Sequence, residues 1–194
     1  MRYPNGMSAP RWLPNAISVG RIGLVPVWIA VAELAQGQPS LAPALPVVLV
    51  VLGLSDVVDG YLARRYDLAT RLGATLDAVA DKLAQLSFVT YLAWFAGPPL
   101  LALPVWFWGV VVARDVLLVI GYLVLLRRQG SVDTEHRVHG KLASVLLFFV
   151  VLSAISPGAS VITPIAVALT AAAIAYSTGD YLWRGWRALA QRAM

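Results

Sequence analysis

The sequence predicts an all-α integral membrane protein with six transmembrane helices, and three observations support this fold class. The first is composition: 59% of the 194 residues are hydrophobic and only 13% are charged, about half the charged share of a soluble domain. The second is the recurrence of apolar runs of membrane-spanning length along the chain. The third is a strict alternation between uncharged and basic connections. We therefore expect one membrane domain over residues 1–194.

Each apolar run holds about 18–27 residues, enough for a helix to cross about 30 Å of hydrocarbon. In chain order, we expect transmembrane helices at residues 15–34, 41–63, 73–96, 100–126, 138–155 and 161–183. Residues 1–14 contain prolines, a tryptophan and two arginines, so we expect a short interfacial segment there, with a disordered tail as the alternative.

The connections indicate how the chain crosses the membrane. Those after the first, third and fifth helices, "AQGQPS", "AGPP" and "SPGAS", carry no charge. The terminal segments and the other two connections are basic, with Arg2, Arg11, Arg64, Arg65, Arg71, Arg127, Arg128, Arg137, Arg184, Arg187 and Arg192. Because basic residues stay on the cytoplasmic side, we expect both termini in the cytoplasm. The net charge of +5 then reflects topology rather than nucleic-acid binding.

Cysteine is missing from the sequence, as is an apolar run that ends in a small-residue cleavage site. Disulfide and thiolate chemistry are thereby excluded, and neither a removable signal peptide nor a transit peptide is predicted. We expect residence in a prokaryotic plasma membrane.

Four aspartates stand in the second and third predicted helices. Asp56 and Asp59 are three residues apart and Asp77 and Asp81 are four apart, so each pair projects from one helix face. The hairpin between these helices brings the two faces together. Both pairs lie within about 15 Å of the basic helix ends. We expect all four carboxylates to line one cavity just below the cytoplasmic surface.

Four ionised carboxylates in a poorly solvated cavity repel one another, so either several are protonated or a multivalent cation holds them. Oxygen ligands without cysteine or histidine favour Mg²⁺, Mn²⁺ or Ca²⁺. Such a cluster often holds two ions, which clamp a phosphoryl group during its transfer. The alternative is a structural role in which the acids pair with Arg64, Arg65, Arg71 and Lys82. Acids inside a membrane are functional by default, which favours the metal site.

Small residues accompany the aspartates, namely Gly60 and Ala63 on the second helix and Gly73 at the start of the third. Small side chains let helices pack closely, or let a flat ligand lie against the backbone. Helix packing is the simpler explanation. Between metal ligands, however, these residues would also leave room for a nucleotide.

The spacing of these residues resembles the motif of the CDP-alcohol phosphotransferases, also called class I CDP-alcohol phosphatidyltransferases. The matching pattern is Asp56-x2-Asp59-Gly60-x2-Ala63-Arg64-x8-Gly73-x3-Asp77-x3-Asp81. The predicted six-helix topology with cytoplasmic termini agrees with the same family. The diagnostic part is the catalytic hairpin, residues 55–82.

Within this family, "PNAISVGRI", "LDAVADK" and "GDYLWRG" resemble phosphatidylglycerophosphate synthases and the related cardiolipin synthases. Two features depart from the pattern. Arg114-Asp115 is closer to cardiolipin synthases than to the Arg-Glu pair common in phosphatidylglycerophosphate synthases, and "HGKLASVLL" lacks the Thr and Gln usual in both groups. We expect glycerol 3-phosphate as the acceptor; phosphatidylglycerol, or another acceptor such as inositol phosphate, is the alternative.

The resemblance implies that a phosphatidyl group passes from CDP-diacylglycerol to an alcohol with release of CMP. It implies that Asp56, Asp59 and Asp77 hold one Mg²⁺ or Mn²⁺ ion, and that Asp77 and Asp81 reach a second. Asp81 would take the proton from the acceptor hydroxyl, which attacks the phosphorus in line.

The resemblance also implies nucleotide-binding residues. Gly60, Ala63 and Gly73 would line the cytidine pocket, with Arg64 near the phosphates. Asn15 and Arg21 of the first helix are further candidates to approach the nucleotide. The alternative for Arg21 is a side chain that extends to the membrane interface.

Three basic residues are candidates to bind a phosphate of the acceptor: Arg114 within the fourth helix, Arg137 before the fifth, and Lys141 at its start. Guanidinium groups form paired hydrogen bonds with phosphate oxygens, and lysine adds a point charge. The alternatives are an ion pair of Arg114 with Asp115 or with the acid cluster, and positive-inside anchoring by Arg137 and Lys141.

A cation transporter or proton-coupled carrier is the main alternative to an enzyme. Such a protein would place its acids near the membrane midplane with access to both faces. Here the acids lie toward one side, which favours an enzyme with its active site facing the cytoplasm. The expected partners are CDP-diacylglycerol, the alcohol acceptor and membrane lipids, without nucleic acid. The resemblance also makes a homodimer plausible.

Overall fold

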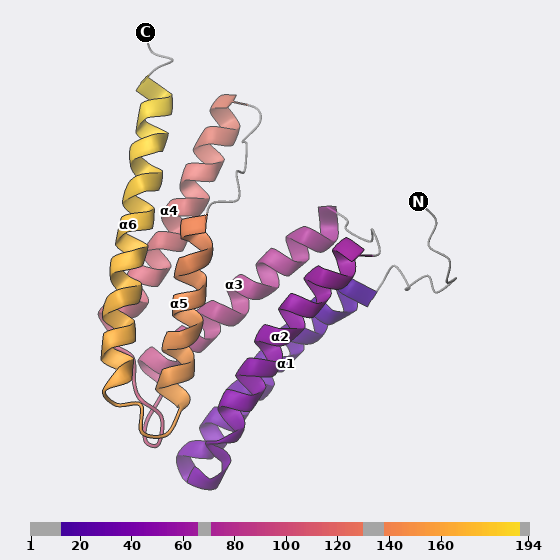
Figure 1. Ribbon diagram of the computed structural model, residues 1–194, viewed down its shortest axis with the longest axis vertical. Coiled ribbons are helices and arrows are strands. Elements are labelled where there is room, and N and C mark those ends of the chain that lie inside the picture. The colour runs from indigo at the N-terminus through magenta and orange to yellow at the C-terminus, as the bar shows by residue number, and fades with distance from the viewer. Residues whose placement is uncertain (1–12, 66–70, 130–137, 191–194) are drawn as a thin grey trace. The chain divides into compact units, whose positions relative to one another are not determined.

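The computed structural model describes residues 13–65, 71–129 and 138–190, and regular structure in these ranges is helical throughout (Figure 1). The helices are α1 (Leu13–Gly37), α2 (Ala44–Arg65), α3 (Arg71–Trp94), α4 (Val105–Gln129), α5 (Val138–Ile155) and α6 (Ile162–Ala190), and a short 3₁₀ helix, η1 (Pro39–Leu41), precedes α2. Each long helix overlaps one predicted segment, so the prediction of an all-α protein is confirmed. Of the predicted interfacial segment, residues 1–12 lie outside the described ranges, and residues 13–14 begin α1.

The connection between α1 and α2 differs from the prediction, because η1 ends at Leu41, the residue at which the second helix was expected to begin. The Ala42 amide donates to the Pro39 carbonyl at 3.1 Å, which closes the η1 turn. Proline has no amide with which to continue α1, but its fixed φ suits the first position of a new helical turn. As a result α2 begins at Ala44 rather than at residue 41.

The chain forms two compact units, Met1–Tyr91 and Leu92–Met194. In the first unit, α1 and α2 lie side by side (Figure 1). The fully buried Trp28 of α1 also contacts α3, with its ring centroid 4.6 Å from that of Phe88 and 5.7 Å from that of Tyr91. Aromatic pairs of this kind add about 0.5–1.5 kcal/mol each beyond area burial. This packing holds α1 against α3.

The contacts between α1 and α3 also give the direction of the two helices. Trp28 meets Phe88, and further along both helices the Gln36 side-chain amide donates to the Tyr91 hydroxyl at 2.8 Å. Residue numbers therefore rise together on α1 and α3. The two helices therefore run parallel.

In the second unit, α6 packs against α4 and against α5. The interior of this unit includes Phe107 and Val111 on α4 and Leu147 and Val150 on α5, which are almost completely buried. The Leu101 amide donates to the Ala154 carbonyl at 2.8 Å, which joins the segment before α4 to the end of α5.

Two glycines have a specific role in the second unit. A Cβ atom at Gly121 of α4 would lie 2.7 Å from Cε1 of Tyr181 on α6, so the missing side chain leaves room for the tyrosine ring. Gly158, between α5 and α6, has a φ of +76°, in the left-handed region that glycine adopts without strain.

Two helices in the described ranges are long and apolar enough to cross a membrane, over Val19–Gly37 and Ile162–Trp183. Both units also expose large apolar side chains. Examples that are more than half exposed are Val47, Leu54, Val119, Ile165 and Leu169. Exposure of such side chains to water is unfavourable, and contact with lipid tails removes that cost.

Candidate functional site

The two carboxylate pairs lie on consecutive helices of the first unit. Asp56 and Asp59 belong to the second half of α2, and Asp77 and Asp81 belong to the first half of α3. Within a continuous α-helix, spacings of three and four residues place each pair on one helix face. The side chains of Asp56, Asp59 and Asp77 fall outside the described part of the structure, whereas that of Asp81 is described.

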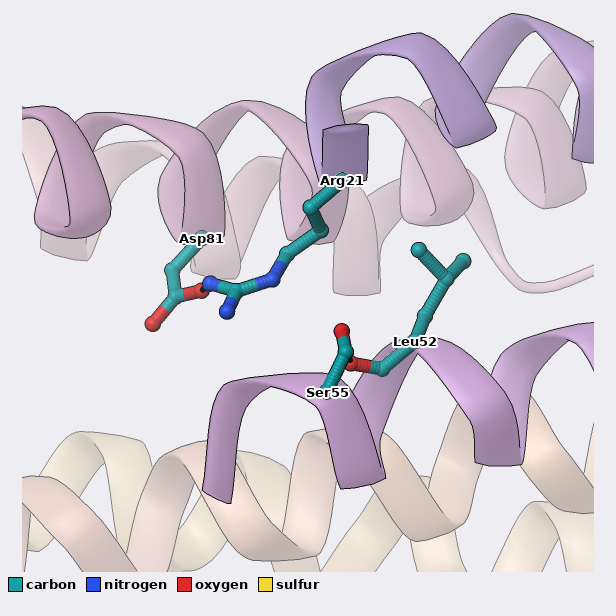
Figure 2. A network of polar contacts seen from close by, with 4 residues as sticks. All are labelled: Arg21, Leu52, Ser55 and Asp81. Carbon is teal, nitrogen blue, oxygen red and sulfur yellow. Dashed lines mark hydrogen bonds and ion pairs between the residues drawn. The ribbon is translucent and has the colours of Figure 1, made fainter. Parts of the chain in front are cut away.

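Asp81 forms an ion pair with Arg21, which lies on α1, 60 residues earlier in the chain. Nη1 of Arg21 donates to Oδ1 of Asp81, and Figure 2 shows the second carboxylate oxygen pointing away from the guanidinium. The Arg21 side chain is 3% exposed, whereas that of Asp81 is 46% exposed. A buried cation needs an anionic partner. The ion pair therefore supplies charge compensation to Arg21 and a further link between α1 and α3.

The position of Arg21 corrects one alternative drawn from the sequence. A side chain that extended to the membrane interface would be accessible, but the structure buries Arg21 in protein. The partnership with Asp81 was not predicted. The available signal was a cation inside an apolar helix, because such a cation usually pairs with an acid or with backbone carbonyls.

Ser55 lies directly before the first aspartate. Its hydroxyl donates to the Leu52 carbonyl of the preceding helical turn at 2.7 Å (Figure 2). A serine inside a helix commonly satisfies its hydroxyl in this way. Ser55 thus shows a local structural role.

The second unit contains the buried Arg114 on α4, with a side chain only 6% exposed. Its Nη1 lies 3.4 Å from Oδ1 of Asp115, so the ion pair considered as an alternative from the sequence is observed. The contact is long, and side chains of adjacent residues leave a helix in different directions. We therefore regard it as a weak pair.

The remaining predicted site residues are placed by the helices that carry them. They are Asn15 in α1, Gly60, Ala63 and Arg64 in α2, Gly73 in α3 and Lys141 in α5. Gly73 is half-buried, and the surroundings of the others fall outside the described part of the structure. Arg137 lies in residues 130–137, which are also outside it.

The donor chemistry of the hairpin fits a hard divalent cation. Asp81 presents a carboxylate that is almost half exposed, with one oxygen turned away from Arg21 (Figure 2). Carboxylate oxygens are preferred ligands of Mg²⁺ and Mn²⁺. Among the side chains that the structure describes, no three His, Cys, Asp or Glu residues gather in one place. Three of the four predicted ligands lie outside that set.

Comparison with known proteins agrees with the pattern of the hairpin. The family profile described as CDP-alcohol phosphatidyltransferase matches residues 11–177. The chain is 33% identical over 176 residues to a cardiolipin synthase (CMP-forming) of Streptomyces coelicolor, covering 89% of this chain and 79% of that protein. It is 30% identical over 146 residues to a CDP-diacylglycerol–glycerol-3-phosphate 3-phosphatidyltransferase of Aquifex aeolicus, covering 75% of each. It is 30% identical over 130 residues to a protein of the same name from Bacillus subtilis, covering 62% of this chain and 64% of that one.

Proposed function

Because the chain belongs to the CDP-alcohol phosphatidyltransferase family, we propose that it transfers a phosphatidyl group from CDP-diacylglycerol to glycerol 3-phosphate, with release of CMP. Membership confirms the resemblance predicted from residues 55–82, and the chain is a transferase of phospholipid biosynthesis. The observation that carries the proposal is the match over residues 11–177, which contains the whole hairpin.

Phosphatidylglycerol is the second candidate acceptor and would give cardiolipin. It is favoured by the alignment with the S. coelicolor cardiolipin synthase over 89% of this chain, and by the Arg114-Asp115 pair. The A. aeolicus and B. subtilis relatives, named for glycerol 3-phosphate, favour the first candidate. Both acceptors offer a hydroxyl and a phosphate, so the same groups of this chain would act on either.

Enzymes of this family generally depend on a divalent metal ion. Here Asp56, Asp59 and Asp77 would hold one Mg²⁺ or Mn²⁺ ion, and Asp77 with Asp81 would hold a second. When bound, such ions neutralise charge on the donor diphosphate and make CMP a better leaving group. The exposure of the Asp81 side chain, which is 46%, supports this assignment, because a metal ligand in an active site must be reachable by both the ion and the substrate.

Asp81 is also the general base. Its carboxylate accepts the proton of the acceptor hydroxyl, whose oxygen attacks the phosphorus that bears diacylglycerol. The bond from that phosphorus to the CMP oxygen breaks on the opposite side, as an in-line transfer requires.

The small residues Gly60, Ala63 and Gly73 form the surface for cytidine, with Asn15 beside the nucleotide and Arg64 near its phosphates. The half-buried position of Gly73 in the first turn of α3 supports this role. A helix surface without large side chains admits a flat ring close to the backbone.

Arg114, Arg137 and Lys141 bind the phosphate of the acceptor. The support comes from Arg114, whose guanidinium is buried and makes only a long contact with Asp115 among the described residues. A guanidinium carries five N–H donors, and a phosphate can accept two of them in parallel.

The two apolar helices and the bacterial relatives indicate a membrane protein. We further propose that residues 1–194 form one domain with six spans, with both termini and the active site on the cytoplasmic side of a prokaryotic plasma membrane. The parallel direction of α1 and α3 supports an alternating order of crossings. A homodimer is part of the proposal.

A test is the release of CMP from CDP-diacylglycerol by the purified protein with Mg²⁺ or Mn²⁺. We expect release that depends on both the ion and an acceptor. A panel of glycerol 3-phosphate, phosphatidylglycerol and inositol phosphate identifies the acceptor through the lipid product. If none of these acceptors supports release, the proposed function is wrong, and cation or proton transport becomes the next activity to assay.

A further inference from the structure

We propose that Arg21 is a positioning residue that holds the carboxylate of Asp81 for metal binding and proton transfer. The inference rests on the proposed function, because it acts through the role assigned to Asp81. Its basis is the ion pair between a guanidinium on α1 and a carboxylate on α3 (Figure 2).

The difference in exposure identifies Arg21 as the fixed end of the pair. With a side chain only 3% exposed, Arg21 is enclosed by protein, whereas the Asp81 side chain is 46% exposed. An exposed aspartate with no partner would sample several rotamers. The bond from the enclosed guanidinium restricts that choice.

The position of Arg21 is itself supported by further contacts between α1 and α3. Further along α1, Trp28 packs on Phe88 and Gln36 bonds to Tyr91, so the same two helices are held at three successive levels. A side chain carried by a packed helix positions its partner more accurately than one carried by a loop. Arg21 therefore sets the place of Asp81 relative to α1.

The hydrogen bond from Arg21 does not prevent the Asp81 carboxylate from binding a cation. A carboxylate has about four lone-pair positions, and Nη1 of Arg21 bonds to Oδ1 while the other oxygen points away (Figure 2). Hydrogen bonding by Arg21 and ligation of a cation by Asp81 are therefore compatible.

The opposite hypothesis is that Arg21 merely competes with the cation for Asp81. Removal of a competing positive charge would strengthen cation binding, because like charges repel. Removal of a group that orients a ligand weakens metal binding, typically by about 10–100-fold. The sign of the change therefore separates the two hypotheses.

The experiment measures Mn²⁺ binding to the purified full chain in detergent by electron paramagnetic resonance of the unbound ion. We expect Arg21→Gln to raise the dissociation constant about 10-fold. Arg21→Lys should raise the dissociation constant less, because lysine keeps the positive charge but lacks the planar set of N–H donors of a guanidinium.

Lys82→Gln is the matched control, because it removes a positive charge one residue from Asp81. The exposed Lys82 amine donates to Gln85 at 3.4 Å, and an exposed charge is screened by solvent and salt, so we expect less than about a twofold change. Tighter or unchanged Mn²⁺ binding by Arg21→Gln would overturn the proposal. If Arg21→Gln does not fold, Arg21→Lys decides: binding weaker than in Lys82→Gln supports the proposal, and wild-type binding overturns it.

A double variant tests whether Arg21 acts through Asp81. Adding Arg21→Gln to Asp81→Ala should cause no further loss of Mn²⁺ binding, because the alanine side chain has no oxygen for Arg21 to hold. If Arg21→Gln weakens Mn²⁺ binding as much in the Asp81 variant as in the wild type, Arg21 has a separate role and the proposal is overturned. In turnover assays, Arg21→Gln should lower kcat while both substrate KM values stay near wild type.

CMP release by the wild-type protein separates failure of this inference from failure of the proposed function. Activity in the wild type with unchanged Mn²⁺ binding in the Arg21 variants overturns the inference alone. Without CMP release from any acceptor, the proposed function is wrong, while the Mn²⁺ measurements still report whether Arg21 positions Asp81.

Discussion

Arg21 and Arg114 are both almost completely buried and both contact an aspartate, but they differ in where that aspartate lies. Arg21 reaches Asp81 on another helix, 60 residues away, whereas Arg114 contacts the adjacent Asp115 at 3.4 Å. A bond between helices restrains both side chains, while a long contact between neighbours on one helix restrains little. This contrast underlies our two proposals, that Arg21 holds a carboxylate of the protein and that Arg114 binds the phosphate of the acceptor.

The largest expected effect comes from Asp81→Asn, which tests the first pair. The amide keeps an oxygen that can accept from Arg21 but cannot take a proton, so turnover should fall by about 10²–10⁴-fold. CMP release at saturating metal ion and substrates measures this loss, with size-exclusion chromatography as the check of folding. Near-normal turnover would remove Asp81 as the base.

Arg114→Ala tests the second pair. Loss of charged hydrogen bonds worth about 1.5–3 kcal/mol should raise the acceptor KM by about 10–100-fold. The donor KM should change far less. If the acceptor KM stays constant, Arg114 has a structural role and the contrast with Arg21 disappears.

Gly121→Ala tests a contact between α4 and α6 in the second unit, for comparison with the ion pair that links α1 and α3 in the first unit. Its Cβ would lie 2.7 Å from the Tyr181 ring, and overpacking of this kind costs about 1–3 kcal/mol. We expect a lower unfolding temperature than in the wild type. The intrinsic fluorescence of the seven tryptophans measures this temperature.

Gly109→Ala is the control on the same helix, since its Cβ would meet nothing within 4 Å. Alanine favours the helix over glycine by about 1 kcal/mol, so this variant should unfold at the same temperature or slightly higher. Equal destabilisation by both substitutions would contradict a specific role for the contact between Gly121 and Tyr181.

The smallest effect is expected from Asp115→Asn. Partly exposed ion pairs contribute about 0–1 kcal/mol, so the acceptor KM should change by less than about fivefold. A change as large as that of Arg114→Ala would show that Asp115 orients the guanidinium, and the two arginines would then be more alike than the structure indicates.

The helices could be predicted from the sequence because apolar runs of sufficient length need no knowledge of tertiary contacts. The start of α2 lies later than predicted because Pro39 favours a separate 3₁₀ turn before it. The hydrophobicity of a segment does not predict such a turn. The helix faces of the four aspartates follow from spacing alone.

The pairing of Arg21 with Asp81 could not be predicted in the same way. Several acids and several cations stand near the same ends of the predicted helices, and spacing along one helix does not say which of them meet across two. That choice depends on the register between α1 and α3, which is set by the packing of Trp28 on Phe88 and Tyr91.

The bond from α1 to α3 has a consequence for protein engineering. Residues 55–82 contain the whole acidic motif, yet one of its members is held by a side chain that this stretch does not include. A chimera that carries the hairpin on a foreign scaffold would contain the predicted metal ligands but would lack Arg21, which positions Asp81. Such a graft should include the turn of α1 around Arg21, or a host helix with an arginine at the same level.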